Sequence, residues 1–75
     1  MRVHERIETK PEVMFGKPVI CGSRVTVEAI LRELGEGATL SDVLAAHPGL
    51  TVDDIRAAQA FAADYLADEE TVAAE

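Results

Sequence analysis

Cys21, His4 and His47 are the side chains of this sequence best suited to act as a nucleophile, a base or a metal ligand. A catalytic cysteine needs a positioned base, and a zinc site needs four ligands at characteristic spacing. No flanking motif accompanies Cys21, and neither histidine has a second histidine or a cysteine at ligand spacing. The Gly16-Lys17-Pro18 stretch matches no phosphate-binding pattern. We therefore expect no catalysis, no metal, no cofactor and no small-molecule substrate, while the role of Cys21 stays open.

The length of 75 residues predicts a single domain, 1–75, because so short a chain cannot support two cores. Hydrophobic residues make up 48% of the chain and aromatic ones 4%, with no Trp, so the core has to be built from Val, Ile, Leu and Ala. This composition is typical of helices, and so small a core often gains stability by association. We expect a homodimer, or a permanent partner, around a core of residues 4–68, with residues 69–75 as a flexible acidic tail.

A single cysteine cannot form an internal disulfide, which favours a reducing compartment. The longest apolar runs fall far short of the roughly 20 residues that span a bilayer, and the start of the chain lacks an apolar signal core. We therefore expect a soluble, cytoplasmic protein without a membrane segment.

The basic residues gather in the first part of the chain. Residues 1–32 carry six Lys or Arg against four Asp or Glu, and residues 33–75 carry one against ten, so the charges of +2 and −9 make up the total of −7. A polyanion would have to meet the N-terminal part, and the C-terminal part suits a basic partner. The candidate DNA-binding residues are therefore Arg2, Arg6, Lys17, Arg24 and Arg32.

Two stretches rich in β-branched residues, 4–9 and 18–27, predict a short N-terminal ribbon that turns at Gly22-Ser23. Residues 10–16 between them have turn residues and no sustained period, which predicts a loop. From residue 26 the period becomes helical. We expect a mainly α fold, in which the β segment is followed by a three-helix, helix-turn-helix-like bundle.

Three amphipathic stretches predict the helices. Apolar residues at i, i+3, i+4 and i+7 predict the first helix over 26–35. Thr39 or Ser41 can cap a second helix over 40–46, which His47-Pro48-Gly49 stops. Thr51 and Asp54 resemble a capping box at the start of a third helix, 52–68.

The third helix carries two distinct faces. Its core arc is predicted to comprise Val52, Ile55, Ala58, Ala62, Tyr65 and Leu66, with Phe61 at the edge. The far side holds Ala57, Ala60, Ala63 and Ala67, which is explained equally well by an interface with another helix and by the high helix propensity of alanine. The candidate partner-binding residues are Phe61, Tyr65, Leu66 and Val72.

The helix-turn-helix outline is not matched by a DNA-binding surface. A recognition helix needs Arg, Lys, Asn or Gln near its N-terminus, whereas this one begins Thr51-Val52-Asp53-Asp54 and has Arg56 as its only cation. The two aspartates would face phosphate. Direct reading of bases by this helix is therefore disfavoured, and any DNA contact would depend on the N-terminal cations.

Several segments between Pro11 and Ala63 resemble a small bacterial family first catalogued as domain of unknown function 433 and identified with VapB-type antitoxins. The resemblance rests on Gly16-Lys17-Pro18-Val19-Ile20 paired with Gly22-Ser23-Arg24-Val25, together with the Pro11–Phe15, Gly35–Gly37 and His47–Ala58 segments. It implies a helix-turn-helix-like dimer that pairs with a PIN-like ribonuclease toxin, neutralises it and represses the shared operon. Two positions depart from the family pattern. Cys21 stands where a basic residue is frequent, and Thr26, which can cap a helix, stands where Pro is frequent.

The leading hypothesis is thus an antitoxin-like, homodimeric binding protein, not an enzyme. The alternative is a helix-turn-helix DNA-binding regulator without a toxin partner. Arg24 contacts phosphate or partner under these hypotheses, and the structural alternative is that it pairs with an acidic residue such as Glu28 or Asp54.

Overall fold

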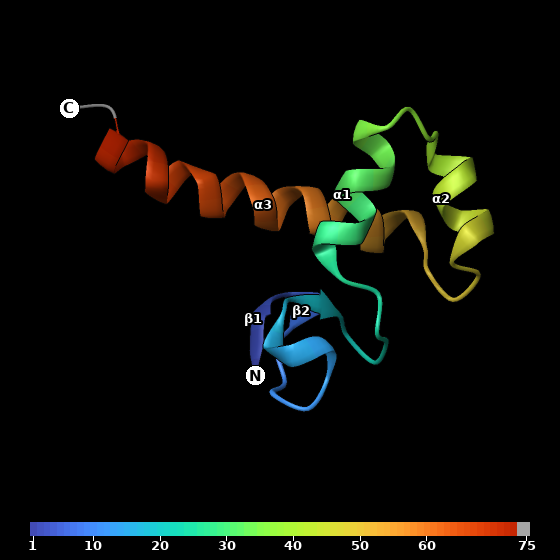
Figure 1. The fold of residues 1–75 in the computed structure, drawn as a ribbon, viewed down its shortest axis with the longest axis horizontal. Helices are drawn as coiled ribbons and strands as arrows, with labels where there is room; N and C mark the ends of the chain where they lie inside the picture. Colours follow the sequence, from blue (N-terminus) through green and yellow to red (C-terminus); the bar gives the residue numbers. More distant parts are fainter. Residues whose placement is uncertain (74–75) are drawn as a thin grey trace.

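A small antiparallel sheet precedes three helices along the chain (Figure 1). The computed structural model describes residues 1–73, with the side chains of all of them except Arg2 and residues 69–73. The sheet has the order β1-β2-β3, and a 3-10 turn, η1, lies between its last two strands. The elements are β1 (Arg2–His4), β2 (Ile7–Glu8), η1 (Met14–Gly16), β3 (Val19–Ile20), α1 (Val27–Gly35), α2 (Leu40–Ala46) and α3 (Val52–Ala73). The prediction of a mainly α fold with a short β segment before three helices is confirmed.

The N-terminal segment forms a hairpin where one extended stretch was predicted. Strands β1 and β2 pair antiparallel with His4 opposite Ile7, so the chain reverses at Glu5 and Arg6. Two-residue hairpin turns usually contain Gly, Asn or Asp, and their absence here explains why the sequence pattern did not indicate the turn. The predicted turn at Gly22-Ser23 is present, with Ile20 N–H donating to the Val25 carbonyl across it at 3.0 Å.

The helices begin at side chains that satisfy their free backbone N–H groups. Thr26 Oγ1 accepts from the Ala29 N–H at 2.9 Å at the start of α1, which confirms its predicted capping role. Thr39 and Asp42 form a reciprocal capping box at the start of α2. Its bounds agree with the predicted 40–46, and the backbone N–H of His47 ends it by donating to the Val43 carbonyl at 3.0 Å.

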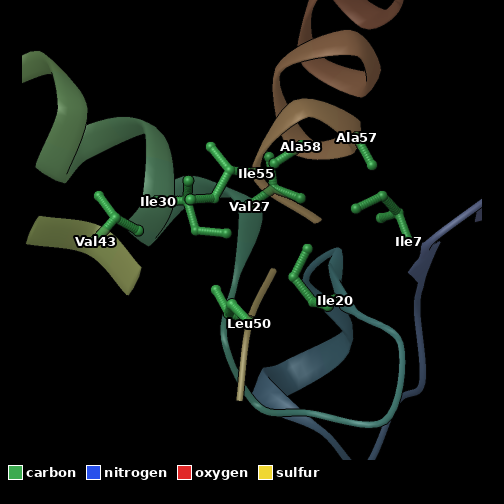
Figure 2. Packing of buried hydrophobic residues seen from close by; sticks show 9 residues of the cluster. All are labelled: Ile7, Ile20, Val27, Ile30, Val43, Leu50, Ile55, Ala57 and Ala58. Atoms are coloured by element: carbon green, nitrogen blue, oxygen red, sulfur yellow. The ribbon is translucent and has the colours of Figure 1, made fainter. Parts of the chain in front are cut away.

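The core lies where the sheet, α1 and the first half of α3 meet (Figure 2). Ile7, Ile30 and Ile55, one from each of these elements, are fully buried. Ala57 was expected on the small outer face of α3, but it is buried and lies beside Ile7 of β2 in Figure 2. The sheet therefore packs on a second face of α3, where a short side chain allows close approach.

The second half of α3 extends away from the rest of the protein (Figure 1). Its 22 residues correspond to about 33 Å of helix, more than the small core can cover. The prediction that Tyr65 and Leu66 belong to the core arc is wrong, since they are 59% and 58% exposed. The helix also continues past its predicted end at Asp68, because no Gly or Pro follows to stop it. The flexibility expected of residues 69–75 stays a prediction, and residues 74 and 75 lie outside the described part of the chain.

Candidate partner-binding groove

An open apolar groove of about 500 Å³ runs between α1 and α3. We call it the α1–α3 groove. Three of the four predicted partner-binding residues line it, whereas the side chain of the fourth, Val72, lies outside the described residues. Its complete lining is Lys17, Pro18, Val27, Glu28, Leu31, Phe61, Ala62, Tyr65 and Leu66.

Phe61 holds the aromatic wall of the groove in place. Its ring meets His4 of β1 edge to face, with centroids 6.4 Å apart, and lies roughly parallel to Tyr65 at 6.5 Å. Both separations are those of interacting aromatic pairs. Phe61 thus joins the sheet to the exposed half of α3 and orients Tyr65 toward the groove. The Nδ1 atom of His4 is buried and has no hydrogen-bond partner among the described residues.

The Glu28 carboxylate binds two basic side chains, Lys17 and Arg32, beside the groove. Glu28 Oε1 accepts from Lys17 Nζ at 2.9 Å, and Glu28 Oε2 accepts from Arg32 Nη2 at 2.8 Å. The hydrogen bond from Lys17, followed by that from Arg32, lowers the pKa of the Glu28 carboxyl below its ordinary value. Two candidate DNA-binding residues are therefore brought together, but both share their charge with Glu28.

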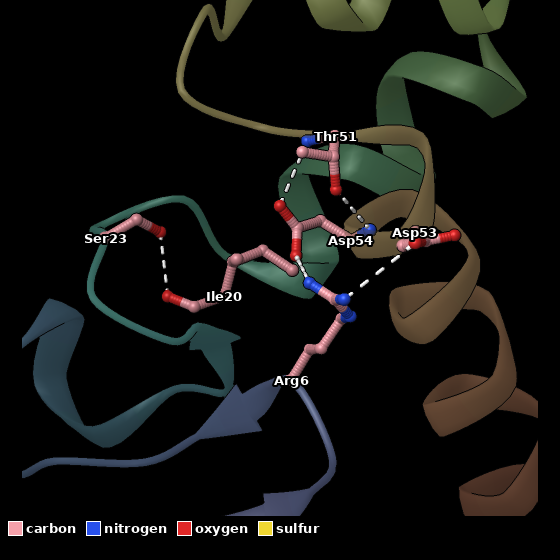
Figure 3. A network of polar contacts seen from close by, with 6 residues as sticks. All are labelled: Arg6, Ile20, Ser23, Thr51, Asp53 and Asp54. Atoms are coloured by element: carbon pink, nitrogen blue, oxygen red, sulfur yellow. Dashed lines mark hydrogen bonds and ion pairs between the residues drawn. The ribbon is translucent and has the colours of Figure 1, made fainter.

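Arg6, a third candidate for DNA contact, points instead to the start of α3 (Figure 3). Its Nη1 donates to Asp54 Oδ1 at 3.2 Å, and its Nη2 lies 3.8 Å from Asp53 Oδ2. The other Asp54 oxygen accepts from the Thr51 N–H at 3.0 Å, and Thr51 Oγ1 accepts from the Asp54 N–H at 3.2 Å. The predicted capping box is confirmed, and it also anchors the β1–β2 turn.

Arg24 makes no ion pair with any residue whose side chain the structure describes, and it is exposed. The expectation that it pairs with Glu28 or Asp54 is therefore wrong, because Lys17, Arg32 and Arg6 occupy those carboxylates. The side chain of Arg2, the remaining DNA-binding candidate, lies outside the described residues. Of the four candidates whose side chains the structure describes, Arg24 is the one whose charge is unshared and accessible.

Phe15 is a surface feature that the sequence pattern did not indicate. The side chain is 95% exposed, and its residue has φ 60°, in the left-handed region. Met14 and Gly16 on either side also have positive φ, at 49° and 82°. The segment 10–16 was predicted as a loop. The sequence did contain a signal for it, because the chain has three aromatic residues and one of them stands directly before Gly16, outside the predicted helices.

The residues considered for catalysis or metal binding do not assemble into a cluster. His47 pairs with Glu33, with Nε2 2.9 Å from Oε2, and Cys21 is a half-buried free thiol. No group of three or more His, Cys, Asp or Glu able to hold a metal occurs within the described residues. No helix in that part of the chain is long and apolar enough to cross a membrane.

The fold and the groove define a small, mainly helical protein with an N-terminal three-stranded sheet and an open apolar surface between two of its helices. The chain belongs to the family described as "Protein of unknown function (DUF433)", which matches residues 7–62. A crystal structure of a DUF433 member protein from Anabaena variabilis is similar to it over 93% of this chain and 69% of that one, at 27% identity and a TM-score of 0.78. Among curated proteins, none matches the sequence significantly. The family membership is thus established, whereas these matches carry no link to VapB-type antitoxins.

Proposed function

We propose that this protein is an antitoxin-like binding protein that neutralises a PIN-like ribonuclease toxin by holding it along α3. The observation that carries the proposal is the α1–α3 groove, where Phe61, Tyr65 and Leu66 form an apolar wall. Aromatic and apolar side chains of this kind, clustered on an open surface, are typical of protein-binding sites. A groove beside a helix is also a common binding site for an amphipathic helix of a partner.

Charge supports a basic partner. Residues 33–75 carry a net charge of −9, and after Arg56 the sequence contains no further Lys or Arg. The described part of α3 beyond the core exposes Asp64 and Asp68 near Tyr65 and Leu66. A ribonuclease has to attract a polyanion and therefore presents positive charge, so an acidic helix is suited to compete with RNA for it.

The test is co-expression with the neighbouring reading frame and purification by a tag on this protein. We expect a stoichiometric partner whose ribonuclease activity is suppressed in the complex. Leu66→Asp should weaken the complex, because it places a charge inside the apolar groove. The matched control is Ala60→Asp, an exposed position on the opposite side of the same helix, which should leave binding unchanged. A purification without a partner, or equal loss from both variants, would contradict the proposal.

The second candidate function, a DNA-binding regulator without a toxin partner, is supported by Arg24, which is exposed and unpaired among the described residues. Arg32 and Lys17, which share Glu28, could add to a weak basic patch, most effectively in a dimer. The exposed Asp53 at the start of α3 argues against DNA binding, because its negative charge repels phosphate. Binding to the protein's own promoter should then weaken steeply with added salt and drop in Arg24→Ala, because phosphate contacts release counterions. A flat salt response would exclude this function.

A further inference from the structure

Phe15 is held in a conformation that does not serve the stability of the free chain. Met14 and Phe15 are both in the left-handed region, which non-glycine residues rarely adopt because of steric strain. The turn is closed by backbone hydrogen bonds, in which Gly16 N–H donates to the Val13 carbonyl at 3.0 Å and Lys17 N–H to that of Met14 at 3.1 Å. The aromatic side chain gains no burial in return, since 95% of it is exposed. A strained backbone that presents an apolar ring to solvent indicates a contact outside the chain.

The α1–α3 groove begins next to this turn. Lys17 and Pro18, two and three residues after Phe15, line it. Phe15 does not fill the groove of its own chain, because it is almost fully exposed and does not line it. The projecting ring and the unfilled apolar groove therefore lie on adjoining surfaces of one molecule.

We propose that Phe15 of one copy inserts into the α1–α3 groove of a second copy, so that two chains form a two-fold symmetric homodimer. In such an interface each copy both donates and receives the same contact. Because the Phe15 turn and the groove adjoin each other on one chain, a single two-fold axis near Pro18 can form both Phe15–groove contacts at once. A groove of about 500 Å³ has room for an aromatic side chain, which would meet the rings of Phe61 and Tyr65.

Charge complementarity favours a second copy as the occupant. Residues 10–17, which contain the Phe15 turn, carry Lys10 and Lys17 against Glu12, a net charge of +1. Each lysine also pairs with a glutamate of its own chain, Lys10 with Glu8 at 3.7 Å and Lys17 with Glu28 at 2.9 Å. The helix that forms the outer wall of the groove carries Asp64 and Asp68 on its exposed part. Insertion of Phe15 brings the basic turn of one copy toward the acidic helix of the other, and the same attraction occurs twice in the dimer.

The homodimer does not depend on the proposed toxin. Where both occur, the toxin and Phe15 of the second copy compete for the α1–α3 groove, so partner binding should dissociate the dimer. If no partner co-purifies, the homodimer proposal is unaffected, because dimerisation is measured with this chain alone.

Sedimentation equilibrium of the full chain tests the proposal. The wild type should be a dimer, and Phe15→Asn should weaken it by at least about tenfold, the loss typical of an interface anchor. Asparagine tolerates the left-handed backbone, so this variant should melt no earlier than the wild type when both are diluted to monomer. Leu66→Asp, inside the groove, should also dissociate the dimer, and Ala60→Asp, on the opposite side of α3, should not.

Mixing the two dissociating variants gives a sharper test. The Leu66→Asp copy retains Phe15 and the Phe15→Asn copy retains an intact groove, so the mixture should form a heterodimer with one intact contact. A wild type that stays monomeric, a Phe15→Asn dimer as tight as the wild type, or a mixture that associates no better than either variant alone would overturn the proposal.

Discussion

Replacing Asp54 by alanine should destabilise the protein by about 1–2 kcal/mol, because one buried carboxylate serves two structural purposes. Asp54 accepts the Thr51 N–H at the start of α3 and also the guanidinium of Arg6, 48 residues earlier in the chain. Its side chain is only 11% exposed, whereas that of Arg6 is 45% exposed. The variant therefore loses a helix cap and the tie between the β1–β2 turn and α3 together.

The magnitude follows from these two parts. Loss of a capping side chain typically costs about 1 kcal/mol. The ion pair with Arg6 contributes at most about 1 kcal/mol, because solvent reaches the guanidinium and screens the pair. For a chain of 75 residues, the combined loss of about 1–2 kcal/mol corresponds to a Tm about 4–16 °C lower.

Urea denaturation at neutral pH followed by circular dichroism measures the change, with Asp53→Ala as the matched control. Asp53 is 73% exposed and lies 3.8 Å from Arg6, so its removal should cost less than about 0.5 kcal/mol. A double-mutant cycle with Arg6→Ala should show coupling, since the Asp54→Ala background has already lost the pair. Equal effects of the two aspartate variants, or strictly additive effects of Arg6→Ala and Asp54→Ala, would refute this account of how the sheet is attached.

Three further substitutions test other parts of the fold by the same denaturation measurement. Thr26→Ala should cost about 1 kcal/mol through loss of the α1 cap, and Thr26→Ser, which keeps the hydroxyl, should cost clearly less. Ile30→Ala should cost about 2–5 kcal/mol, because Ile30 is fully buried and its removal leaves a cavity. Glu28→Gln should be less stable than the wild type at neutral pH, since Lys17 and Arg32 lower the Glu28 pKa. That difference should vanish as the pH falls through the lowered pKa, where the wild-type carboxylate becomes protonated as well; a pH-independent difference would contradict it.

The helices could be predicted from the sequence because several local signals agree for each of them. For α2, Thr39 and Ser41 were the candidate caps, of which Thr39 is the cap in the structure, and Pro48 marks the stop just beyond. The β1–β2 turn and the left-handed Phe15 could not be predicted, because neither has the Gly or Asn that usually indicates such backbone. At Phe15 the surrounding structure imposes a left-handed backbone that the local sequence does not favour, whereas Glu5 and Arg6 in the β1–β2 turn do not have positive φ.

The candidate site was predicted in part. Phe61, Tyr65 and Leu66 were identified from the apolar pattern of α3, and they line one wall of the groove. The opposite wall includes Val27 and Leu31, whose spacing in α1 is that of ordinary core residues. Which residues of an amphipathic face become core and which stay open depends on where the neighbouring element ends. That end is a property of the tertiary structure and leaves no signal in the helix itself.

The two halves of α3 differ in whether they are free to bind another molecule. At its N-terminus, where a recognition helix would present side chains to bases, Asp54 turns inward to Thr51 and Arg6, and Asp53 places a negative charge on the surface. At positions 53 and 54, the helix start is thus stabilised by acidic side chains, whereas binding phosphate would require basic or neutral ones. The outer half is under no such constraint, since the core ends before Tyr65 and Leu66. Binding at the outer half, to a second copy or to a basic protein, is therefore compatible with everything that holds α3 in place.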